Sequence, residues 1–342
     1  MSTTPQPSFT PVFFNPRAKT GAFLTAQGQV AVPVPGQSAY VYSDAIVLAV
    51  NVAMATHRPL LLAGSPGTGK TTLAANVAHV LGWRFYPRVV NSRTRARDLM
   101  WSFDALRRLA DAQASAHQGA GSLRPREAYI EPQPLWWAFD PESARLRGAV
   151  AGANSGAGAG ASAQAVPHAE DPNQGADAAE AVVLLDEIDK AEPDLPNDLL
   201  EALDRSRFTI DELDPPRSVA ASRDRVLTFI TTNGERELPA AFLRRCIVIK
   251  LDPPSPQWLV GVANARFGPA GEALHTAIAQ RVRVLRDAAL RSNLREPSTA
   301  EYLDALAACR GLGIDQNAAE WRLLEQAVLW KRDEPVPASG EG

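Results

Sequence analysis

This chain of 342 residues has few cysteines, a small net charge and no long apolar run. The two cysteines, Cys246 and Cys309, have the spacing of neither a metal site nor a disulfide framework, so we expect free buried thiols. A formal charge of -3 gives no global basic field of the kind that drives sequence-independent binding to nucleic acid. No apolar run reaches the length of a membrane span, and Met1 to Pro16 lacks the charged start and apolar core of a secretory signal. These absences predict a cytoplasmic protein with no membrane span.

The chain does contain enough apolar material for folded cores, because 45% of its residues are hydrophobic and its length suits about two domains. Residues 148–181 are almost wholly Ala, Gly, Ser and Asn with a few acids, which predicts a disordered loop because such a segment buries little apolar surface. Prolines at 253, 254 and 256 mark a domain boundary. The parts expected in chain order are an extended arm over 1–40, an α/β domain over 41–252, a helical domain over 253–334 and a disordered tail over 335–342.

Short apolar runs alternate with helical periodicity in the α/β domain. Strands are predicted at 59–63, 84–90, 181–185, 226–231 and 247–251. This alternation predicts a mostly parallel sheet with helices on both faces. Beyond the prolines only helical periodicity remains, with Ile278, Val282, Leu285 and Ala289 on one face, which predicts a small all-α domain.

A glycine-rich segment follows the first predicted strand. Its glycines let backbone N–H groups surround phosphate oxygens, Lys70 can reach the β and γ phosphates, and the Thr71 hydroxyl can ligate Mg²⁺. The helix that follows adds the positive end of its dipole. We therefore predict binding of a nucleoside triphosphate with Mg²⁺ at this segment, Gly64-Ser65-Pro66-Gly67-Thr68-Gly69-Lys70-Thr71-Thr72.

Acidic and amide side chains follow two later strands. Asp186 and Glu187 stand at the carboxyl end of a buried strand, the edge where open α/β sheets bind ligands. Asp186 can hold Mg²⁺ through water opposite Thr71, and Glu187 can take a proton from the water that attacks the γ phosphate. Asn233 ends the next strand and can orient that water or contact the γ phosphate.

An arginine pair, Arg244 and Arg245, stands just before the last predicted strand. An arginine beside a γ phosphate stabilises charge that develops in the transition state, and a neighbouring subunit can supply it. We therefore expect a homo-oligomer.

The order of these motifs resembles an AAA+ ATPase, and specifically the MoxR-like branch. The segments that carry the resemblance are the glycine-rich loop, Asp186-Glu187-Ile188-Asp189, Asn233, Arg244-Arg245, Tyr129-Ile130-Glu131-Pro132 before Leu135-Trp136, and Leu294-Arg295-Glu296-Pro297-Ser298-Thr299-Ala300-Glu301. The resemblance implies a P-loop α/β core with a parallel sheet flanked by helices, followed by a small all-α lid. It also implies a hexameric ring that hydrolyses ATP with Mg²⁺ to remodel or activate a protein partner, such as a von Willebrand A domain protein. Arg295 would then reach the nucleotide from the lid.

This chain departs from the branch at the arginines, because Arg244-Arg245-Cys246 stands where relatives more often have Asp-Arg-Phe. The choice between the two arginines stays open, with Arg245 favoured. The insertion at 148–181 is not a feature of the family either.

Three other functions fit parts of the sequence. A local basic stretch could contact nucleic acid, as in a nucleic-acid-associated AAA+ motor, although solvated faces and ion pairs usually explain such arginines. A nucleotide-gated assembly scaffold with little hydrolysis would not need the acidic pair. A small-molecule P-loop kinase would not account for the lid segment. The basic stretch comprises Arg84, Arg88, Arg93, Arg95, Arg97, Arg107 and Arg108.

Overall fold

The computed structural model describes residues 10–25, 28–33, 39–118, 123–149, 166–173, 178–292, 294–315 and 318–331. The tail expected over 335–342 lies outside the described residues. The chain divides into two compact units. The first unit contains the residues up to Asn51, Ala63–Asn76 and the residues from Ile249 onward, and the second contains Val52–Leu62 and Val77–Val248. The N-terminal segment, the glycine-rich loop and the C-terminal helices thus share one unit although they are far apart in the sequence.

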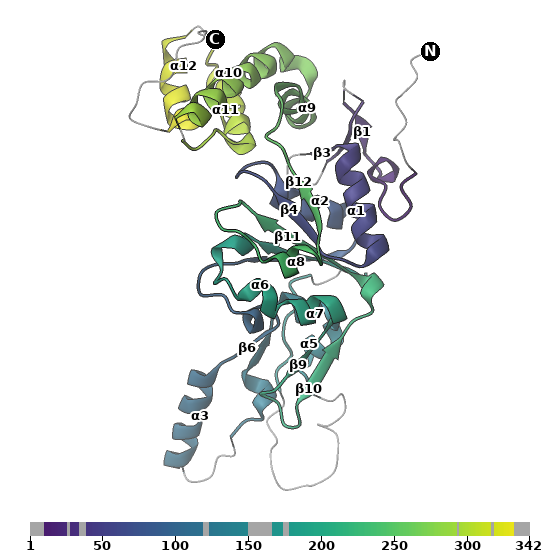
Figure 1. Cartoon of the computed structure of the whole chain (residues 1–342). Coiled ribbons are helices and arrows are strands. Elements are labelled where there is room, and N and C mark those ends of the chain that lie inside the picture. Colours follow the sequence, from purple (N-terminus) through teal and green to yellow (C-terminus); the bar gives the residue numbers. More distant parts are fainter. Residues whose placement is uncertain are drawn as a thin grey trace. The chain divides into compact units, whose positions relative to one another are not determined.

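A central sheet of five parallel strands has the order β12-β4-β11-β8-β5 and confirms the predicted sheet (Figure 1). Its strands β4 and β8 have almost no exposed side chain, as expected for strands covered on both faces. Leu227 of β11 pairs with Val182 of β8, and Arg84 of β5 pairs with Ala181. The strands are β4 (Leu60–Ala63), β5 (Arg84–Val89), β8 (Ala181–Asp186), β11 (Val226–Thr232) and β12 (Ile247–Lys250).

Helices and an aromatic cluster complete the core of the second unit. Trp136, Trp137 and Phe139 of α4 (Pro134–Phe139) are buried, and the ring of Trp136 meets that of Phe208 edge-on at 6.3 Å. These aromatic side chains are therefore core residues. The other helices here are α5 (Pro141–Arg145), α6 (Leu195–Asp198), α7 (Leu200–Arg205) and α8 (Ala240–Leu243).

Two antiparallel ribbons extend the second unit. The strands β6 (Trp101–Phe103) and β7 (Ile130–Pro132) pair, and α3 (Ala105–Gln118) stands at the far end of this ribbon (Figure 1). The strands β9 (Arg207–Ile210) and β10 (Arg217–Ala220) form the second ribbon.

The N-terminal segment differs from the extended arm that the sequence predicts. It forms a three-stranded antiparallel sheet of β1 (Phe23–Leu24), β2 (Val30–Val32) and β3 (Tyr40–Tyr42), after a turn of 3₁₀-helix at Pro16–Ala18. The strands are too short to give a periodic signal. The side chains of β2 and β3 are nevertheless buried, and Ala31 and Val41 share an apolar cluster with C-terminal residues. In α1 (Asp44–Thr56), Asn51 accepts hydrogen bonds from the backbone N–H groups of residues 12, 13 and 14.

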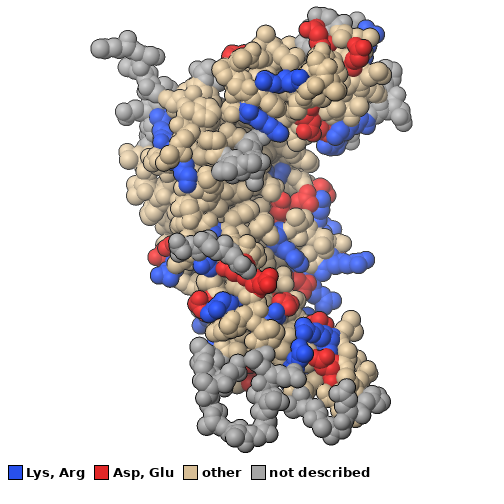
Figure 2. Space-filling model, turned by 180° about the vertical axis from the view of Figure 1, so that it is seen from behind, with Lys and Arg blue, Asp and Glu red and all other residues tan. Residues whose placement is uncertain are grey.

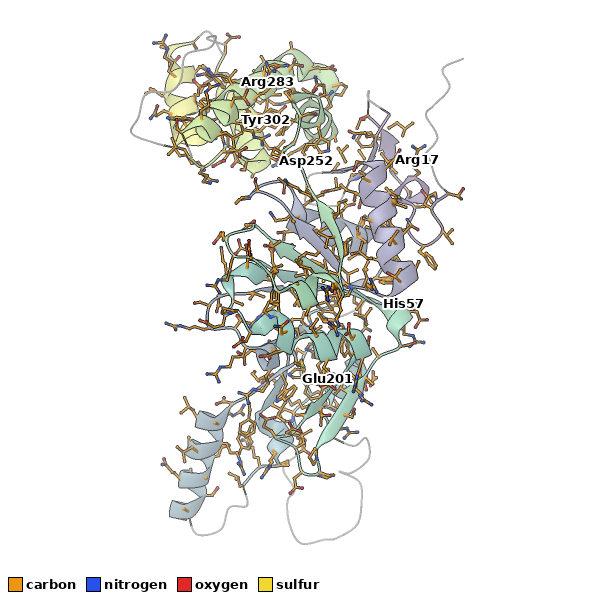
Figure 3. All side chains as sticks on the ribbon, in the orientation of Figure 1. Arg17, His57, Glu201, Asp252, Arg283 and Tyr302 are labelled. Atoms are coloured by element: carbon orange, nitrogen blue, oxygen red, sulfur yellow. The ribbon has the colours of Figure 1, made fainter. Side chains whose placement is uncertain are left out.

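The C-terminal helical region, residues 253–331 and called the lid below, shares its apolar core with Ala31 and Val41 of the N-terminal sheet. The expected face of Ile278, Val282, Leu285 and Ala289 is confirmed, because all four side chains are fully buried. Tyr302, labelled in Figure 3, is also buried and donates a hydrogen bond to the carbonyl of His275. Among the described helices, none combines the length and the apolar character that crossing a membrane requires. The lid helices are α9 (Pro256–Phe267), α10 (Glu272–Arg291), α11 (Thr299–Leu312), α12 (Ala319–Leu324) and the π-helix Glu325–Trp330.

Residues 166–173 belong to the loop that the sequence predicts to be disordered, yet they bind β5. The side-chain amide of Asn173 accepts from the N–H of Phe85 at 2.9 Å and donates to its carbonyl at 3.0 Å. Asp171 accepts from Arg84 and from the Tyr86 hydroxyl. These polar bonds do not need large apolar side chains, which is why composition did not predict them. Residues 150–165 of this loop lie outside the described residues.

Acidic and basic side chains are interspersed on the face shown in Figure 2, where neither sign forms a continuous area. Two arginines of the local basic stretch have acidic partners, since Arg84 pairs with Asp171 and Arg97 with Glu212. Both pairings fit the interpretation of these arginines as ordinary surface ion pairs.

Candidate functional site

The glycine-rich loop of the first unit joins β4 to α2 (Lys70–Leu81). Gly64, Gly67 and Gly69 have φ values of 157°, 80° and 88°, in the region that residues with a Cβ rarely adopt. The Lys70 ammonium lies within the loop, where it donates to the carbonyl of Gly64 at 2.7 Å and to that of Ser65 at 3.0 Å. The loop thus has the left-handed glycines and the inward-facing cation that a phosphate cradle requires.

The structure also shows the positions of the other residues that were predicted to bind phosphate. The Thr68 hydroxyl donates to the carbonyl of Ser65, which closes the turn. Pro66 is exposed at its tip. Thr71 and Thr72 stand in the first turn of α2, where the backbone N–H groups have no intrahelical partner and favour an anion.

The lid contacts this loop within the first unit. Ser298 caps the N-terminus of α11, and the backbone N–H of Thr299 donates to the carbonyl of Gly67 at 3.4 Å. A Cβ built on Gly67 would lie only 2.2 Å from the Cβ of Ser298. The segment expected to act from the lid is therefore packed on the loop itself.

Arg295, expected to bind the nucleotide, forms an ion pair with Glu301 at 2.9 Å. Lys331 also binds the Glu301 carboxylate at 2.7 Å. Burial alone would raise the pKa of Glu301, but the bonds from Lys331 and Ser298 and the charge of Arg295 outweigh it and lower this pKa. The Arg295 side chain is 60% exposed, so a ligand in solvent can contact its guanidinium while the ion pair with Glu301 is present.

A cavity of about 430 Å³ opens beside the loop within the first unit. Thr68 lines it together with side chains from the N-terminal sheet, α1, β12 and the start of the lid. Its walls are largely apolar, with a few polar groups among them, as is usual for small-molecule sites. Sequence reasoning missed this cavity because no local pattern links its parts, which include Tyr40, Ile46, Leu251, Pro254 and Trp258.

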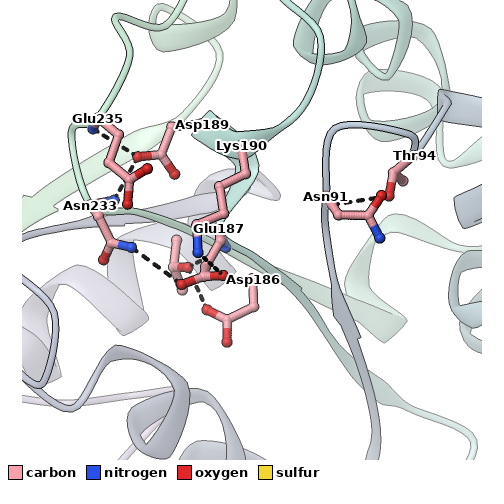
Figure 4. A network of polar contacts seen from close by, with 9 residues as sticks. Asn91, Thr94, Asp186, Glu187, Asp189, Lys190, Asn233 and Glu235 are labelled. Carbon is pink, nitrogen blue, oxygen red and sulfur yellow. Dashed lines mark hydrogen bonds and ion pairs between the residues drawn. The ribbon is translucent and has the colours of Figure 1, made fainter.

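The acidic group lies in the second unit, at the carboxyl end of β8 (Figure 4). Asn233 donates from its side-chain amide to Glu187 Oε1 at 3.3 Å, and Lys190 pairs with Glu187 Oε2 at 2.7 Å. Asp186 Oδ1 accepts a hydrogen bond from the Thr231 hydroxyl. The structure therefore brings Asp186, Glu187 and Asn233 together, as the sequence predicts, and adds Lys190 and Thr231 to them.

Asp189 fixes the loop that carries Asn233. Its carboxylate is almost fully buried, and Oδ2 accepts from the backbone N–H groups of Asn233 and Glu235, both at 3.0 Å. Sequence reasoning gave Asp189 no role, since a carboxylate that binds a backbone 44 residues away leaves no local signal.

The two arginines of the second unit differ in their surroundings. Arg245 pairs with Asp204 at 2.6 Å and donates to the carbonyl of Ala241. Arg244 is exposed, and no described side chain binds it. Arg244 therefore has the more available guanidinium.

The side chains fit a magnesium ion that is bound mainly by substrate. Mg²⁺ is usually held by one or two carboxylates together with phosphate oxygens and water. The described residues contain no group of three or more His, Cys, Asp or Glu that could hold a metal without such help. Within the second unit, the Asp186 carboxylate at the end of β8 is one donor of this kind.

The chain is similar to a known protein family and to solved structures. Residues 59–246 match the family model described as AAA domain (dynein-related subfamily). A crystal structure from Cytophaga hutchinsonii ATCC 33406, described as a "putative ATPase", is 14% identical, covers 83% of this chain and 80% of its own, and superposes with a TM-score of 0.38. No curated protein matches the chain. Because the family model spans more than half of the chain, and the glycine-rich loop and the acidic strand end both fall within it, this protein belongs to the AAA family.

Proposed function

We propose that this protein is a Mg²⁺-dependent ATP hydrolase of the MoxR-like type, which acts as an oligomeric ring, expected to be a hexamer, to remodel or activate a protein partner. The observation that carries the hydrolytic role is the Glu187 carboxylate, held by Asn233 and Lys190 directly after Asp186. A scaffold that only binds nucleotide has no use for a carboxylate placed in this way.

Each residue has a defined task in this proposal. The loop N–H groups and Lys70 bind the phosphates, and Thr71 with Asp186 would hold Mg²⁺. Bound Mg²⁺ neutralises charge on the phosphate oxygens. Glu187 accepts a proton from the attacking water, and Asn233 fixes the direction of its carboxylate.

The cavity beside Thr68 suits the nucleobase. It adjoins the loop that binds the phosphates, and its aromatic and aliphatic walls offer a surface on which a purine can stack. Arg295 reaches the phosphates from the lid in this arrangement. Its ion-pair partner Glu301 also binds the N–H of Ser298, the residue that packs on Gly67.

The ring and its partner follow from the family resemblance and from the exposed Arg244. An arginine finger has a purpose only if a neighbouring subunit presents a nucleotide to it. A von Willebrand A domain protein is the partner that the resemblance suggests.

Phosphate release from Mg²⁺-ATP by the full chain tests the proposal. Glu187→Gln should bind ATP with unchanged affinity and lose at least about 100-fold in turnover, since the base is absent. Glu201→Gln is the matched control, because Glu201 (Figure 3) is an exposed acid that pairs with Arg205 on the surface. Normal turnover by Glu187→Gln would contradict the assigned base. ATP-dependent assembly with no phosphate release would favour the scaffold instead. A pull-down with the Glu187→Gln variant, which should accumulate in the ATP state, would identify the protein partner.

A further inference from the structure

The hydroxyl of Thr231 lies between the two acidic residues of the candidate site. Thr231 is the second-last residue of β11 and is 0% exposed. Its Oγ1 accepts from the backbone N–H of Glu187 at 2.8 Å and donates its own proton to Asp186 Oδ1. A hydroxyl has a single proton to donate, so one side chain on β11 fixes both acids at the end of β8.

Glu187 needs such support because its backbone is in the left-handed region, with φ 62° and ψ 49°. A residue with a Cβ persists there only when its surroundings hold it. The Glu187 N–H is bound by Thr231, and its carbonyl accepts from the N–H of Lys190 at 3.0 Å. Both backbone groups of this strained residue are therefore occupied.

Hydrogen bonds between the segments that follow β8 and β11 also connect the two strand ends. Asp189, just after β8, accepts from the backbone of the loop after β11, and Asn233 of that loop donates back to the Glu187 carboxylate (Figure 4). The Glu187 side chain is thus positioned through Asp189 and Asn233, whereas its backbone and the Asp186 carboxylate are positioned through Thr231.

We propose that Thr231 is a positioning residue, which sets the orientation of the Asp186 carboxylate toward the metal and holds the strained turn that presents Glu187. This inference rests on the proposed function, since it concerns the same site. Side chains that orient a metal ligand typically change metal affinity or activity by about 10- to 100-fold when they are removed. Valine has the shape of threonine without the hydroxyl, and serine keeps the hydroxyl.

The test compares Thr231→Val, Thr231→Ser and, as matched control, Thr228→Val in the full chain. Thr228 is also buried on β11, but it is three residues away and therefore faces the other side of the sheet. Thr231→Val should lower kcat by about 10- to 100-fold and weaken Mn²⁺ binding to the nucleotide complex by about tenfold. The KM for ATP should stay within about threefold, because the phosphate loop is untouched.

Rescue separates positioning from general destabilisation. Thr231→Ser should recover kcat and Mn²⁺ affinity to within about threefold of the original chain, and Thr228→Val should match that chain. The inference is overturned if Thr231→Val keeps normal kcat and Mn²⁺ affinity, or if Thr231→Ser falls as low as Thr231→Val. Should Thr231→Val fail to fold, Thr231→Ala replaces it in the same comparison.

A third readout needs no nucleotide. Hydrogen exchange at the Glu187 amide should be faster in Thr231→Val than in the original chain and in Thr231→Ser, because its acceptor is gone. Equal exchange rates would overturn the positioning role whatever the activity. Absence of phosphate release from the unmodified chain would instead contradict the proposed function, and the exchange rates would still decide the role of Thr231.

Discussion

Gly67 and Ser298 approach so closely that a Cβ on Gly67 would lie 2.2 Å from the Ser298 Cβ and 3.0 Å from its Cα. The lid helix α11 therefore begins directly on the phosphate loop. Because Gly67 also has a φ of 80°, a side chain there is opposed by backbone strain and by a neighbour whose own backbone would have to move.

Gly67→Ala should therefore lower the free energy of unfolding and abolish ATP binding, measured by urea denaturation and by titration with a fluorescent ATP analogue. Gly82→Ala is the control, since Gly82 has a φ of 73° but no atom within 4 Å of the new Cβ. This control should lose only the left-handed strain of about 1–2 kcal/mol and bind ATP normally. Equal behaviour of the two variants would show that the contact with Ser298 is unimportant.

Trp258→Ala should weaken ATP binding by about tenfold, because Trp258 lines the cavity assigned to the base and base–aromatic stacking contributes roughly 1–3 kcal/mol. Binding of inorganic tripolyphosphate should be unchanged, since this ligand has no base. Trp83→Ala controls for the loss of a tryptophan outside the cavity. If tripolyphosphate and ATP lose affinity equally, the cavity is not the base site.

Arg244→Ala should reduce kcat of the assembled protein by roughly 10³-fold, as expected for an arginine finger, with little change in ATP affinity. Arg245→Ala should have a smaller effect, because Arg245 is paired with Asp204 of its own subunit. This expectation reverses the preference for Arg245 that the sequence alone suggests.

Mixing variants tests whether the arginine acts between subunits. Arg244→Ala and Glu187→Gln subunits are each inactive alone in this scheme, but a mixed ring contains sites with one intact base and one intact arginine. Activity should therefore reappear on mixing. Recovery with Arg245→Ala subunits in place of Arg244→Ala would assign the finger to Arg245.

His275 should make the protein less stable in mild acid. It is fully buried in the lid, its Nδ1 lies 2.7 Å from Asn264 Oδ1, and its Nε2 has no described partner. Burial and then the charge of Arg310 lower the pKa of His275, against the opposing charge of Glu272. The unfolded chain therefore binds the proton first, near pH 6.5, and stability falls as the pH drops through that value until the folded histidine is protonated as well.

The free energy of unfolding should decrease between pH 7.5 and 5.5 with a slope of at most about 1.4 kcal/mol per pH unit from this group. His275→Gln should flatten the slope, and His57→Gln, at an exposed histidine, should not. An unchanged slope in His275→Gln would mean that other groups cause the acid sensitivity.

The sheet could be predicted because its inner strands β4, β8 and β11 are short buried runs of apolar and β-branched residues. The phosphate loop and the Asp186–Glu187 pair could be predicted for a related reason, since their chemistry is carried by neighbouring residues in fixed order. Asn233 was expected after a neighbouring strand, but its hydrogen bond to Glu187 could not be predicted from the sequence.

The features that could not be predicted from the sequence depend on contacts between residues that are far apart in the chain. Ser298 meets Gly67 across 231 positions, and Asn51 binds backbone N–H groups more than 36 residues before it. Such pairs leave no periodic pattern, because one partner is usually a backbone group that any residue provides. In the sequence, Thr231 is one of the many β-branched residues that stand near strand ends, so its bonds to Asp186 and Glu187 could not be predicted.

The pairing of Asn173 with Phe85 has a consequence for solubility. β5 is an outer strand of the sheet, and such strands offer unpaired backbone groups on which a second polypeptide can add itself. At Phe85 both groups are already occupied by the Asn173 amide, and Pro87 two residues later has no N–H to offer. The Asn173 amide and Pro87 therefore limit the backbone groups that a second polypeptide could pair with at this edge. The composition of the insertion alone does not indicate this role.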